Sequence, residues 1–195
     1  PFKKLYILLF KNINTRKIFD DVVAHYQALS SAGRPKNNSV EVNTKKEENA
    51  FFYVSSSEWN LYDYLDTFFT LNKLPNGSFL LSQIKKWYQL FKTGKTKHEG
   101  KLLRINRLFV HFPKQRFVLF GDNSQSDPSI YETLTKKYSD RISAVYKRNV
   151  AKANEAATAE ILKKIKARNI AVLQFTHSGE AIAHSKEIGL INVEK

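Results

Sequence analysis

Short apolar runs alternate with amphipathic segments along most of this chain. The apolar runs, such as FVLF and IAVL, are continuous, which is typical of strands that are covered on both faces. We expect strands over residues 50–57, 78–84, 116–122, 141–150 and 170–175. Apolar positions at helical spacing predict helices over residues 3–10, 16–33, 58–74, 101–113, 128–139, 153–169 and 178–190. Because strands and helices alternate, we predict an α/β fold with a three-layer, doubly wound and mostly parallel sheet.

Two segments follow neither pattern. Residues 34–49, RPKNNSVEVNTKKEEN, are polar and rich in turn-forming residues, so we expect a flexible loop there. Residues 85–100 form a basic connection whose structure the pattern does not define. A length of 195 residues fits one domain with a good core, and we predict a single domain over residues 1–195.

The composition excludes several classes of protein. The hydrophobic fraction of 42% is that of a folded chain rather than a disordered one. Cysteine is absent, which excludes disulfides and thiolate metal sites. The longest apolar runs are far too short to span a bilayer, and we expect a cytoplasmic protein. Methionine is also absent and the first residue is Pro1, so we expect the sequence to begin inside a longer polypeptide.

The net charge of +14 changes the range of possible partners. A field of this sign attracts phosphates, nucleic acid or an anionic membrane surface. The basic residues are scattered, however, and a solvated basic surface explains them equally well. No nucleic-acid recognition motif is visible, so we rank a nucleic-acid partner last. A peripheral contact with an anionic membrane stays open, because residues 87–95 mix aromatic and basic side chains.

Candidate chemistry lies where the predicted strands end, because parallel α/β sheets bind ligands at the carboxyl ends of their strands. Asp122 and Asp127 follow the strand at 116–122, and carboxylates with water are the ligands that Mg²⁺ prefers. Asp127 also precedes Pro128 and is a natural helix N-cap. Ser55 ends an apolar run, where its hydroxyl and the backbone amides could hold a phosphoryl oxygen. The alternative there is a serine turn in which Ser57 caps the next helix.

Other residue types give no comparable signal. The five histidines do not have the spacing of a helical zinc site, and we interpret them as surface or partly buried residues. No P-loop, nucleophile elbow or dinucleotide-binding glycine motif occurs. Asn149, at the carboxyl end of the strand predicted over 141–150, is a further polar residue at the expected ligand edge.

Two long blocks resemble a known family. FFYVSSSEWNLY is similar to the block YVSxSPWxLY, and FVLFGDNSQSDPSIY is similar to FxLxGDSGxxDPxxY. RISAVYKRNV is similar to the strand RVxAIYIRxV. These blocks belong to the catalytic domain of the actin-patch-associated phosphatidate phosphatases and their bacterial relatives, within the haloacid dehalogenase (HAD) superfamily. Glu58 stands where the family has Pro, and Ser124 stands where it usually has Gly.

The resemblance implies a mechanism and a set of roles. It implies that Ser55, with Ser56, binds the phosphoryl group, and that Lys101 offsets its negative charge. It implies that Asp122 and Asp127 hold Mg²⁺ directly or through water. In such enzymes an aspartate attacks phosphorus to form an aspartyl-phosphate, and a second aspartate acts as acid and base.

The nucleophile motif DxDxT of that family is absent from this sequence. We expect it, with the first strand of the sheet, upstream of Pro1. The leading hypothesis is therefore a Mg²⁺-dependent phosphomonoester hydrolase acting on phosphatidate, another lipid phosphate or a phosphorylated small molecule. The alternative is an inactive phosphatase-like module that binds a phosphorylated ligand or an anionic surface.

Overall fold

The computed structural model describes residues 21–32, 48–82, 95–124 and 127–191, with the side chains of residues 95–98 and 127 left out. The predicted helix over residues 3–10, most of the loop at 34–49 and most of the basic connection lie outside these ranges. Within the described part of the chain, no helix is both long and apolar enough to cross a bilayer.

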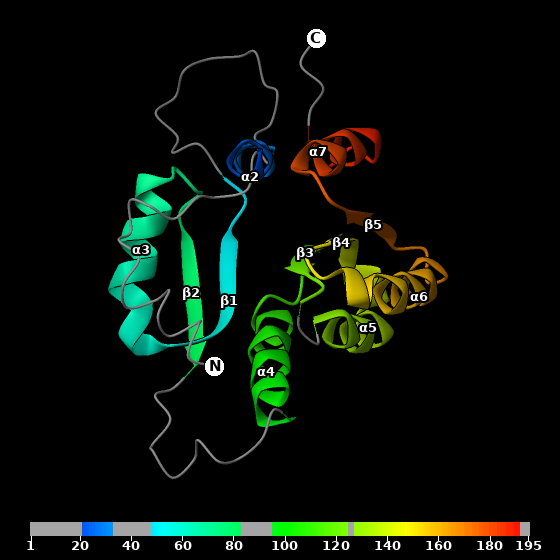
Figure 1. Ribbon diagram of the computed structural model, residues 1–195, viewed down its shortest axis with the longest axis horizontal. Coiled ribbons are helices and arrows are strands. Elements are labelled where there is room, and N and C mark those ends of the chain that lie inside the picture. Colours follow the sequence, from blue (N-terminus) through cyan, green and yellow to red (C-terminus); the bar gives the residue numbers. More distant parts are fainter. Residues whose placement is uncertain (1–20, 33–47, 83–94, 125–126, 192–195) are drawn as a thin grey trace.

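Two parallel strands and a covering helix form the first half of the fold. β1 (Phe51–Glu58) pairs with β2 (Gly77–Ser82), and the connection contains η2 (Trp59–Leu61) and α3 (Tyr62–Leu71). Aromatic side chains fill the space between α3 and these strands, because Tyr53 contacts both Phe69 and Phe79 with ring centroids 4.5 and 5.4 Å apart. Figure 1 shows α3 lying along this strand pair.

A three-stranded parallel sheet forms the second half. β4 (Ile142–Arg148) lies between β3 (Phe117–Asp122) and β5 (Ala171–Phe175). The central position of β4 explains its apolar sequence, because Ala144, Val145 and Tyr146 are fully buried.

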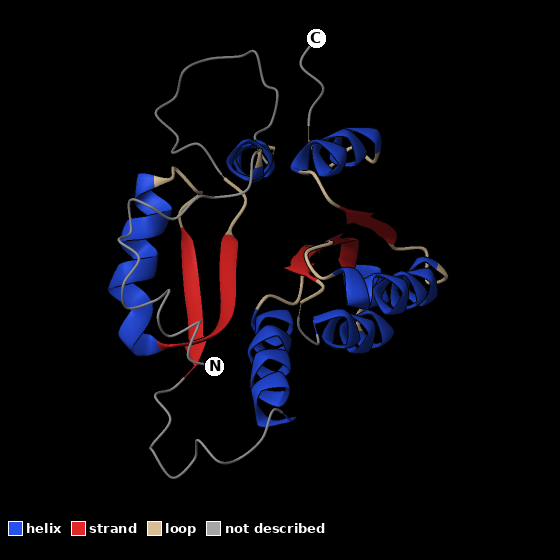
Figure 2. Cartoon of the chain, in the orientation of Figure 1, coloured by secondary structure: helices blue, strands red, loops and turns tan. Residues whose placement is uncertain are grey.

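Helices cover both faces of this sheet, which gives three layers. α5 (Asp127–Lys137) and α6 (Glu155–Lys166) share a hydrophobic core with Val145 on one face. α7 (Ser178–Glu187) packs on the other face, where Ala181 meets Ala144 and Tyr146. The short helices η4 (Ser139–Arg141) and η5 (Lys152–Asn154) flank β4. Figure 2 shows the strands between these helical layers.

Two further helices join the halves. α2 (Val22–Ser31) places Tyr26 against Phe51 of β1 and Phe120 of β3, with ring centroids 5.7 and 5.3 Å apart. α4 (Lys95–His111) contacts β1 and α5, and its Ile105 belongs to the hydrophobic core that α5 and α6 form with β3 and β4. The two halves are therefore held together by helix packing on both faces.

The predicted fold class is confirmed, and four details differ. Among the described residues the parallel strands form two sheets rather than one, because β1 and β3 are each an edge strand. α4 begins at Lys95, six residues before the predicted start at 101. Ser57 does not cap the next helix, since β1 continues to Glu58 and Glu58 occupies the cap position. His25, expected to be a surface or partly buried residue, is almost fully buried, with only 2% of its surface exposed.

Candidate active site

A cavity of about 750 Å³ lies between the two sheets. Its walls are residues 51–55 of β1 and 117–120 of β3, with Arg116 just before β3 and apolar side chains from α2, α3 and α4. Ser55 and Lys101, which are far apart in the sequence, both line it. The fold therefore brings these two predicted phosphate-binding residues to one cavity.

Ser55 is held in a short hydrogen-bonded turn at the end of β1. Its hydroxyl lies 3.0 Å from the Ser57 hydroxyl and accepts a hydrogen bond of 3.1 Å from the Ser57 backbone N–H. The Ser55 carbonyl accepts a 3.1 Å bond from Nη2 of Arg104, on α4. Ser55 is thus held through its hydroxyl by its own strand and through its carbonyl by the helix that carries Lys101.

Arg104 is a site residue that the sequence prediction missed. It lies three residues after Lys101, on the same side of a helix, and that spacing is the signal that could have found it. Burial lowers the pKa of the Arg104 guanidinium, but an arginine stays charged at neutral pH. The helix therefore presents a second positive charge beside Ser55.

Ser56 takes a different position from Ser55. It is half-buried in β1, and side chains in a strand alternate between faces, so Ser56 points away from Ser55 and Ser57. It does not line the cavity. Any contact between Ser56 and a bound phosphate would use its backbone amide.

Asp122 ends β3, the strand on the opposite side of the cavity. Its Oδ1 accepts hydrogen bonds from the Ser124 backbone N–H at 2.9 Å and the Ser124 hydroxyl at 2.6 Å. Asp122 is half-buried and does not line the cavity itself, although residues 117–120 of its strand do. Asp127 is the first residue of α5, and its side chain lies outside the description.

An asparagine cluster follows Asp122. Asn123 is fully buried, and its side chain bonds to Asn149 and to the backbone of the loop after β4. Asn149 was expected at this edge, whereas Asn123 was missed. A polar residue directly after a predicted ligand at the end of a buried strand was the available signal.

Two basic residues of β4 add positive charge beside Asp122. Lys147 is opposite Gly121 and Arg148 is opposite Asp122 in the strand register. The buried Lys147 ammonium lies 4.3 Å from the centre of the Tyr131 ring. Arg148 donates to the Thr176 carbonyl at 2.8 Å, and burial is the main cause that lowers its pKa. The Lys147 side chain thus lies against α5 and the Arg148 side chain against the loop before α7.

The donors suit Mg²⁺ in chemistry, though they do not form a complete cage. Asp122 offers one carboxylate oxygen, Oδ2, that has no hydrogen-bond partner among the described residues. No group of three or more His, Cys, Asp or Glu side chains that could hold a metal occurs in the described ranges. Mg²⁺ commonly takes one or two carboxylates, with water and substrate phosphate completing its shell.

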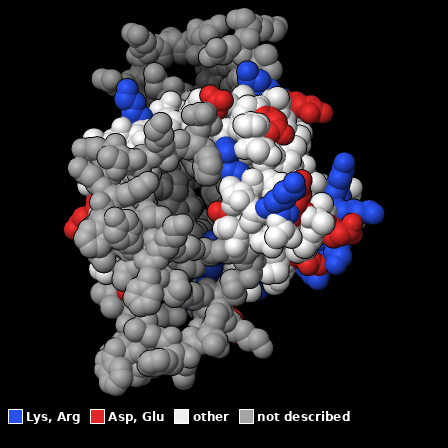
Figure 3. Space-filling model, viewed as in Figure 1, with Lys and Arg blue, Asp and Glu red and all other residues white. Residues whose placement is uncertain are grey.

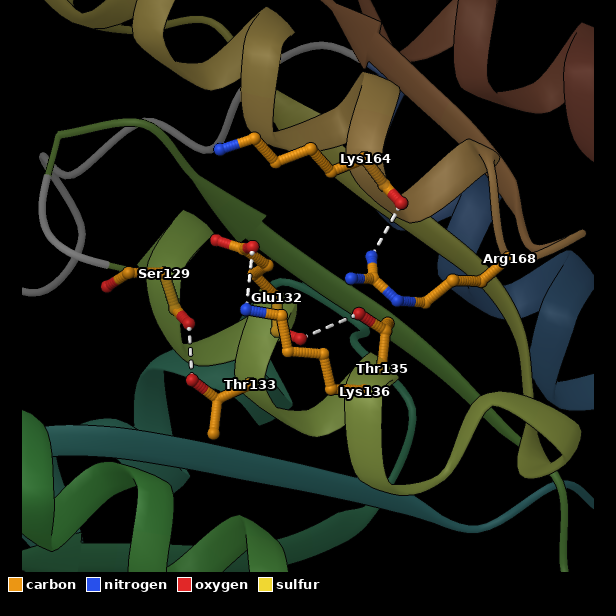
Figure 4. A network of polar contacts seen from close by, with 7 residues as sticks. All are labelled: Ser129, Glu132, Thr133, Thr135, Lys136, Lys164 and Arg168. Carbon is orange, nitrogen blue, oxygen red and sulfur yellow. Dashed lines mark hydrogen bonds and ion pairs between the residues drawn. The ribbon is translucent and has the colours of Figure 1, made fainter.

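Part of the positive charge is ordinary solvated surface. Figure 3 shows basic and acidic side chains mixed on the side of the molecule where α5 and α6 lie. Figure 4 shows that the contacts there are local, with Lys136 3.0 Å from Glu132 and Thr133 donating to the Ser129 carbonyl. A hydrogen bond from Lys136 lowers the pKa of Glu132. The charge of this face is therefore no sign of a binding site.

The fold and the cavity define a class: a parallel α/β protein with a largely apolar cavity between its two sheets, lined by Ser55 and Lys101. Comparison with protein families then gives the family. Residues 1–149 match "Phosphatidate phosphatase APP1, catalytic domain", and the chain belongs to this family.

A curated relative agrees with the family assignment. The Saccharomyces cerevisiae protein "Phosphatidate phosphatase APP1" is 29% identical over 96 residues, which are 49% of this chain and 16% of the yeast protein. The chain thus spans a small part of that relative. No solved structure matches the chain.

Proposed function

We propose that this chain is part of a Mg²⁺-dependent, HAD-type phosphomonoester hydrolase whose substrate is phosphatidate or another lipid phosphate. The cavity shared by Ser55 and Lys101 is the observation that carries the proposal. The substrate class follows from the family name and from the name of the yeast relative.

Each residue at the carboxyl edge has a proposed task. Ser55 donates a hydrogen bond to a phosphoryl oxygen, and Lys101 with Arg104 offsets the negative charge of the phosphate. Oδ2 of Asp122, together with Asp127, would hold Mg²⁺ directly or through water. Bound Mg²⁺ would supply charge neutralisation at the phosphoryl oxygens. Phosphoryl transfer consists largely of such positioning and charge stabilisation, so this set of groups suits it.

The nucleophile would come from a further strand. Among the described residues, β1 and β3 are each the edge strand of their sheet and both line one cavity, and unpaired strand edges can accept a further strand. A strand inserted between β1 and β3, at the usual spacing of about 4.8 Å from each, would pair with both and join the two sheets. An acyl chain in the cavity would leave those backbone groups unpaired. We propose that this strand carries the DxDxT motif and belongs to the polypeptide upstream of Pro1.

Two aspartates on that strand would account for both steps of phosphomonoester hydrolysis. A carboxylate oxygen of the first aspartate forms a bond to phosphorus as the ester P–O bond breaks, and the second aspartate protonates the leaving alcohol. Water then attacks phosphorus while the second aspartate takes its proton, which releases phosphate and regenerates the first aspartate.

Hydrogen exchange tests the inserted strand. The chain of residues 1–195 is compared with a polypeptide extended upstream through the DxDxT motif. We expect the amides of residues 51–54 and 118–120 to become more protected in the longer polypeptide, because both strands gain a partner. Equal protection of these amides in the two polypeptides would refute the proposal that a strand is inserted between β1 and β3.

Phosphate release tests the activity. The full-length protein is assayed on phosphatidate vesicles, a short-chain lipid phosphate and a soluble phosphomonoester, each with Mg²⁺ and with EDTA. We expect release only with Mg²⁺, with phosphatidate preferred over the soluble ester. Absence of release from every substrate would overturn the enzyme proposal.

A second candidate is a binding module without turnover. The residues upstream of Pro1 distinguish the two candidates, because a DxDxT strand there supports the enzyme and its absence there supports the binding module. It predicts that the full-length protein binds a phosphorylated ligand at the same cavity, with Ser55→Ala weakening binding and no phosphate being released. Turnover by the full-length protein would exclude it.

The location of the protein is part of the proposal. We propose a cytoplasmic protein that contacts an anionic membrane surface peripherally, supported by the net charge of +14. Co-sedimentation with vesicles that contain anionic lipid should decrease as salt is raised, because exposed charges are screened. Equal binding to neutral and anionic vesicles would contradict the contact.

A further inference from the structure

We propose that Asn123 is the positioning residue for Asp122, and that its side-chain amide sets the affinity of the carboxyl edge for a divalent cation. The inference rests on the proposed function, because it assigns Asp122 to cation binding. Asn123 follows Asp122 directly, and no part of its side chain is exposed.

The Asn123 side chain uses its entire hydrogen-bonding capacity. Its Oδ1 accepts from the backbone N–H groups of Val150 and Ala151, both at 2.8 Å. Its Nδ2 donates to Oδ1 of Asn149 at 2.5 Å and to the Ala151 carbonyl at 2.9 Å. An amide side chain has two acceptor sites and two donor hydrogens, so all four are occupied.

The chemistry of the partners fixes the orientation of this amide. Backbone N–H groups only donate and a carbonyl only accepts, so Oδ1 must face Val150 and Nδ2 must face the Ala151 carbonyl. An aspartate would present an acceptor to the Ala151 carbonyl, and a serine has too few groups. Of the common side chains of this size, asparagine alone meets all four requirements.

The contacts of Asn123 join the ends of three strands. Its backbone N–H donates to the Arg148 carbonyl at 3.1 Å, and its carbonyl accepts from Nδ2 of Asn154 at 2.6 Å. Asn149 in turn donates its backbone N–H to the Phe175 carbonyl at the end of β5, at 2.7 Å. The loop after β3 is therefore tied to β4 directly and to β5 through Asn149.

Asp122 lies between this anchored residue and the strand ladder. On one side its Cα pairs with Arg148, and on the other side the Asn123 side chain fixes the backbone. Ser124 then holds Oδ1, and among the described residues Oδ2 is left as the oxygen available to a cation. A metal-ligating carboxylate needs a defined orientation, and groups that orient ligands tune metal affinity.

Direct binding of Mn²⁺ tests this assignment without any assay of turnover. Mn²⁺, used in place of Mg²⁺, is titrated into the full-length protein while free Mn²⁺ is followed by electron paramagnetic resonance. We compare the wild type with Asn123→Ala, Asn149→Ala and Asp122→Asn. The matched control is Asn106→Ala, because Oδ1 of Asn106 accepts from the Tyr138 hydroxyl at 2.7 Å and Asn106 lies on α4, away from Asp122.

We expect Asn123→Ala to raise the Mn²⁺ dissociation constant by about tenfold at unchanged stoichiometry, because loss of an orienting group typically costs tenfold or more in metal affinity. Asn149→Ala removes one of the four bonds and should shift the constant in the same direction by less. Asn106→Ala should lower the melting temperature without changing Mn²⁺ affinity.

The outcomes separate the inference from the proposed function. If the wild type and Asp122→Asn bind Mn²⁺ equally, or neither binds it, both the cation-binding role of Asp122 and the positioning role of Asn123 are refuted. If Asp122→Asn alone loses Mn²⁺ while Asn123→Ala binds as tightly as the wild type, the positioning role is overturned and the function stands. If Asn123→Ala does not fold, Asn149→Ala decides, and an unchanged dissociation constant for that variant overturns the role.

Discussion

Replacing His25 should remove a defined part of the acid sensitivity of this protein. His25, on α2, is 2% exposed, and its Nε2 lies 2.9 Å from the hydroxyl of Ser185 on α7. That hydroxyl also lies 2.8 Å from the Tyr146 hydroxyl, and Nδ1 of His184 lies 3.0 Å from the same tyrosine oxygen. The rings of Phe120 and Tyr146 pack edge-on against the imidazole. A charged imidazole has no compensating anion among these contacts.

Burial lowers the pKa of His25 to about 4, from an ordinary value of 6.5. The unfolded chain therefore takes up a proton at a higher pH than the folded chain. The stability contributed by the neutral form is complete above pH 6.5 and is lost as the pH falls towards 4. The difference between the two pKa values corresponds to a total loss of about 3 kcal/mol, of which about 2 kcal/mol should be gone at pH 5.

Urea unfolding at pH 7.5 and pH 5 measures this loss. His25→Gln stays neutral at both pH values, so its free energy of unfolding should fall by about 2 kcal/mol less than that of the wild type. His111→Gln is the matched control, because His111 is exposed on α4, and it should behave as the wild type does. If His25→Gln loses as much stability between the two pH values as the wild type, the burial of a neutral His25 is refuted.

Two other predictions concern packing and the phosphate site. A Cβ on Gly77 would lie 2.6 Å from a backbone carbonyl of β1, so Gly77→Ala should lower the free energy of unfolding by about 1–3 kcal/mol in urea titrations. Gly179→Ala, where nothing lies within 4 Å of the added atom, should cause no loss, and equal effects of both changes would contradict the close approach. Arg104→Ala frees the Ser55 carbonyl and should lower kcat/KM about tenfold, or ~1.4 kcal/mol, in steady-state assays of the full-length protein. Arg107→Ala, on the exposed side of the same helix, should leave kcat/KM unchanged. An equal loss of kcat/KM in both variants would refute the role of Arg104 in the site.

The pattern of the sequence predicts the elements well because burial and periodicity act together in them. The strand at 141–150 contains Ala144, Val145 and Tyr146, and all are fully buried in β4 as a continuous apolar run requires. The helix that begins at Lys95 was placed too late, because its first turn, KTKHEG, is polar and lacks apolar periodicity. Tertiary structure rather than pattern determines where such a helix starts.

The site could be predicted only as far as it follows from topology. Asp122 ends β3 and Ser55 lies in the last half of β1, and the rule that ligands bind at the carboxyl ends of parallel strands selects both. Arg104 and Asn123 were missed because their roles depend on contacts with residues distant in sequence, Ser55 in one case and Val150 in the other. The division into two sheets was also missed, since strand patterns do not reveal which edges are paired.

Phosphate release from phosphatidate vesicles by the full-length protein tests the central claim most directly when the wild type is compared with Asp122→Asn and Asp140→Asn. Asp140 is an exposed acid in η4, so its variant controls for the loss of a surface charge. We predict Mg²⁺-dependent release by the wild type and by Asp140→Asn, and loss of nearly all release in Asp122→Asn with its thermal unfolding unchanged. Undiminished release by a folded Asp122→Asn protein would contradict the assignment of the carboxyl edge as the catalytic site.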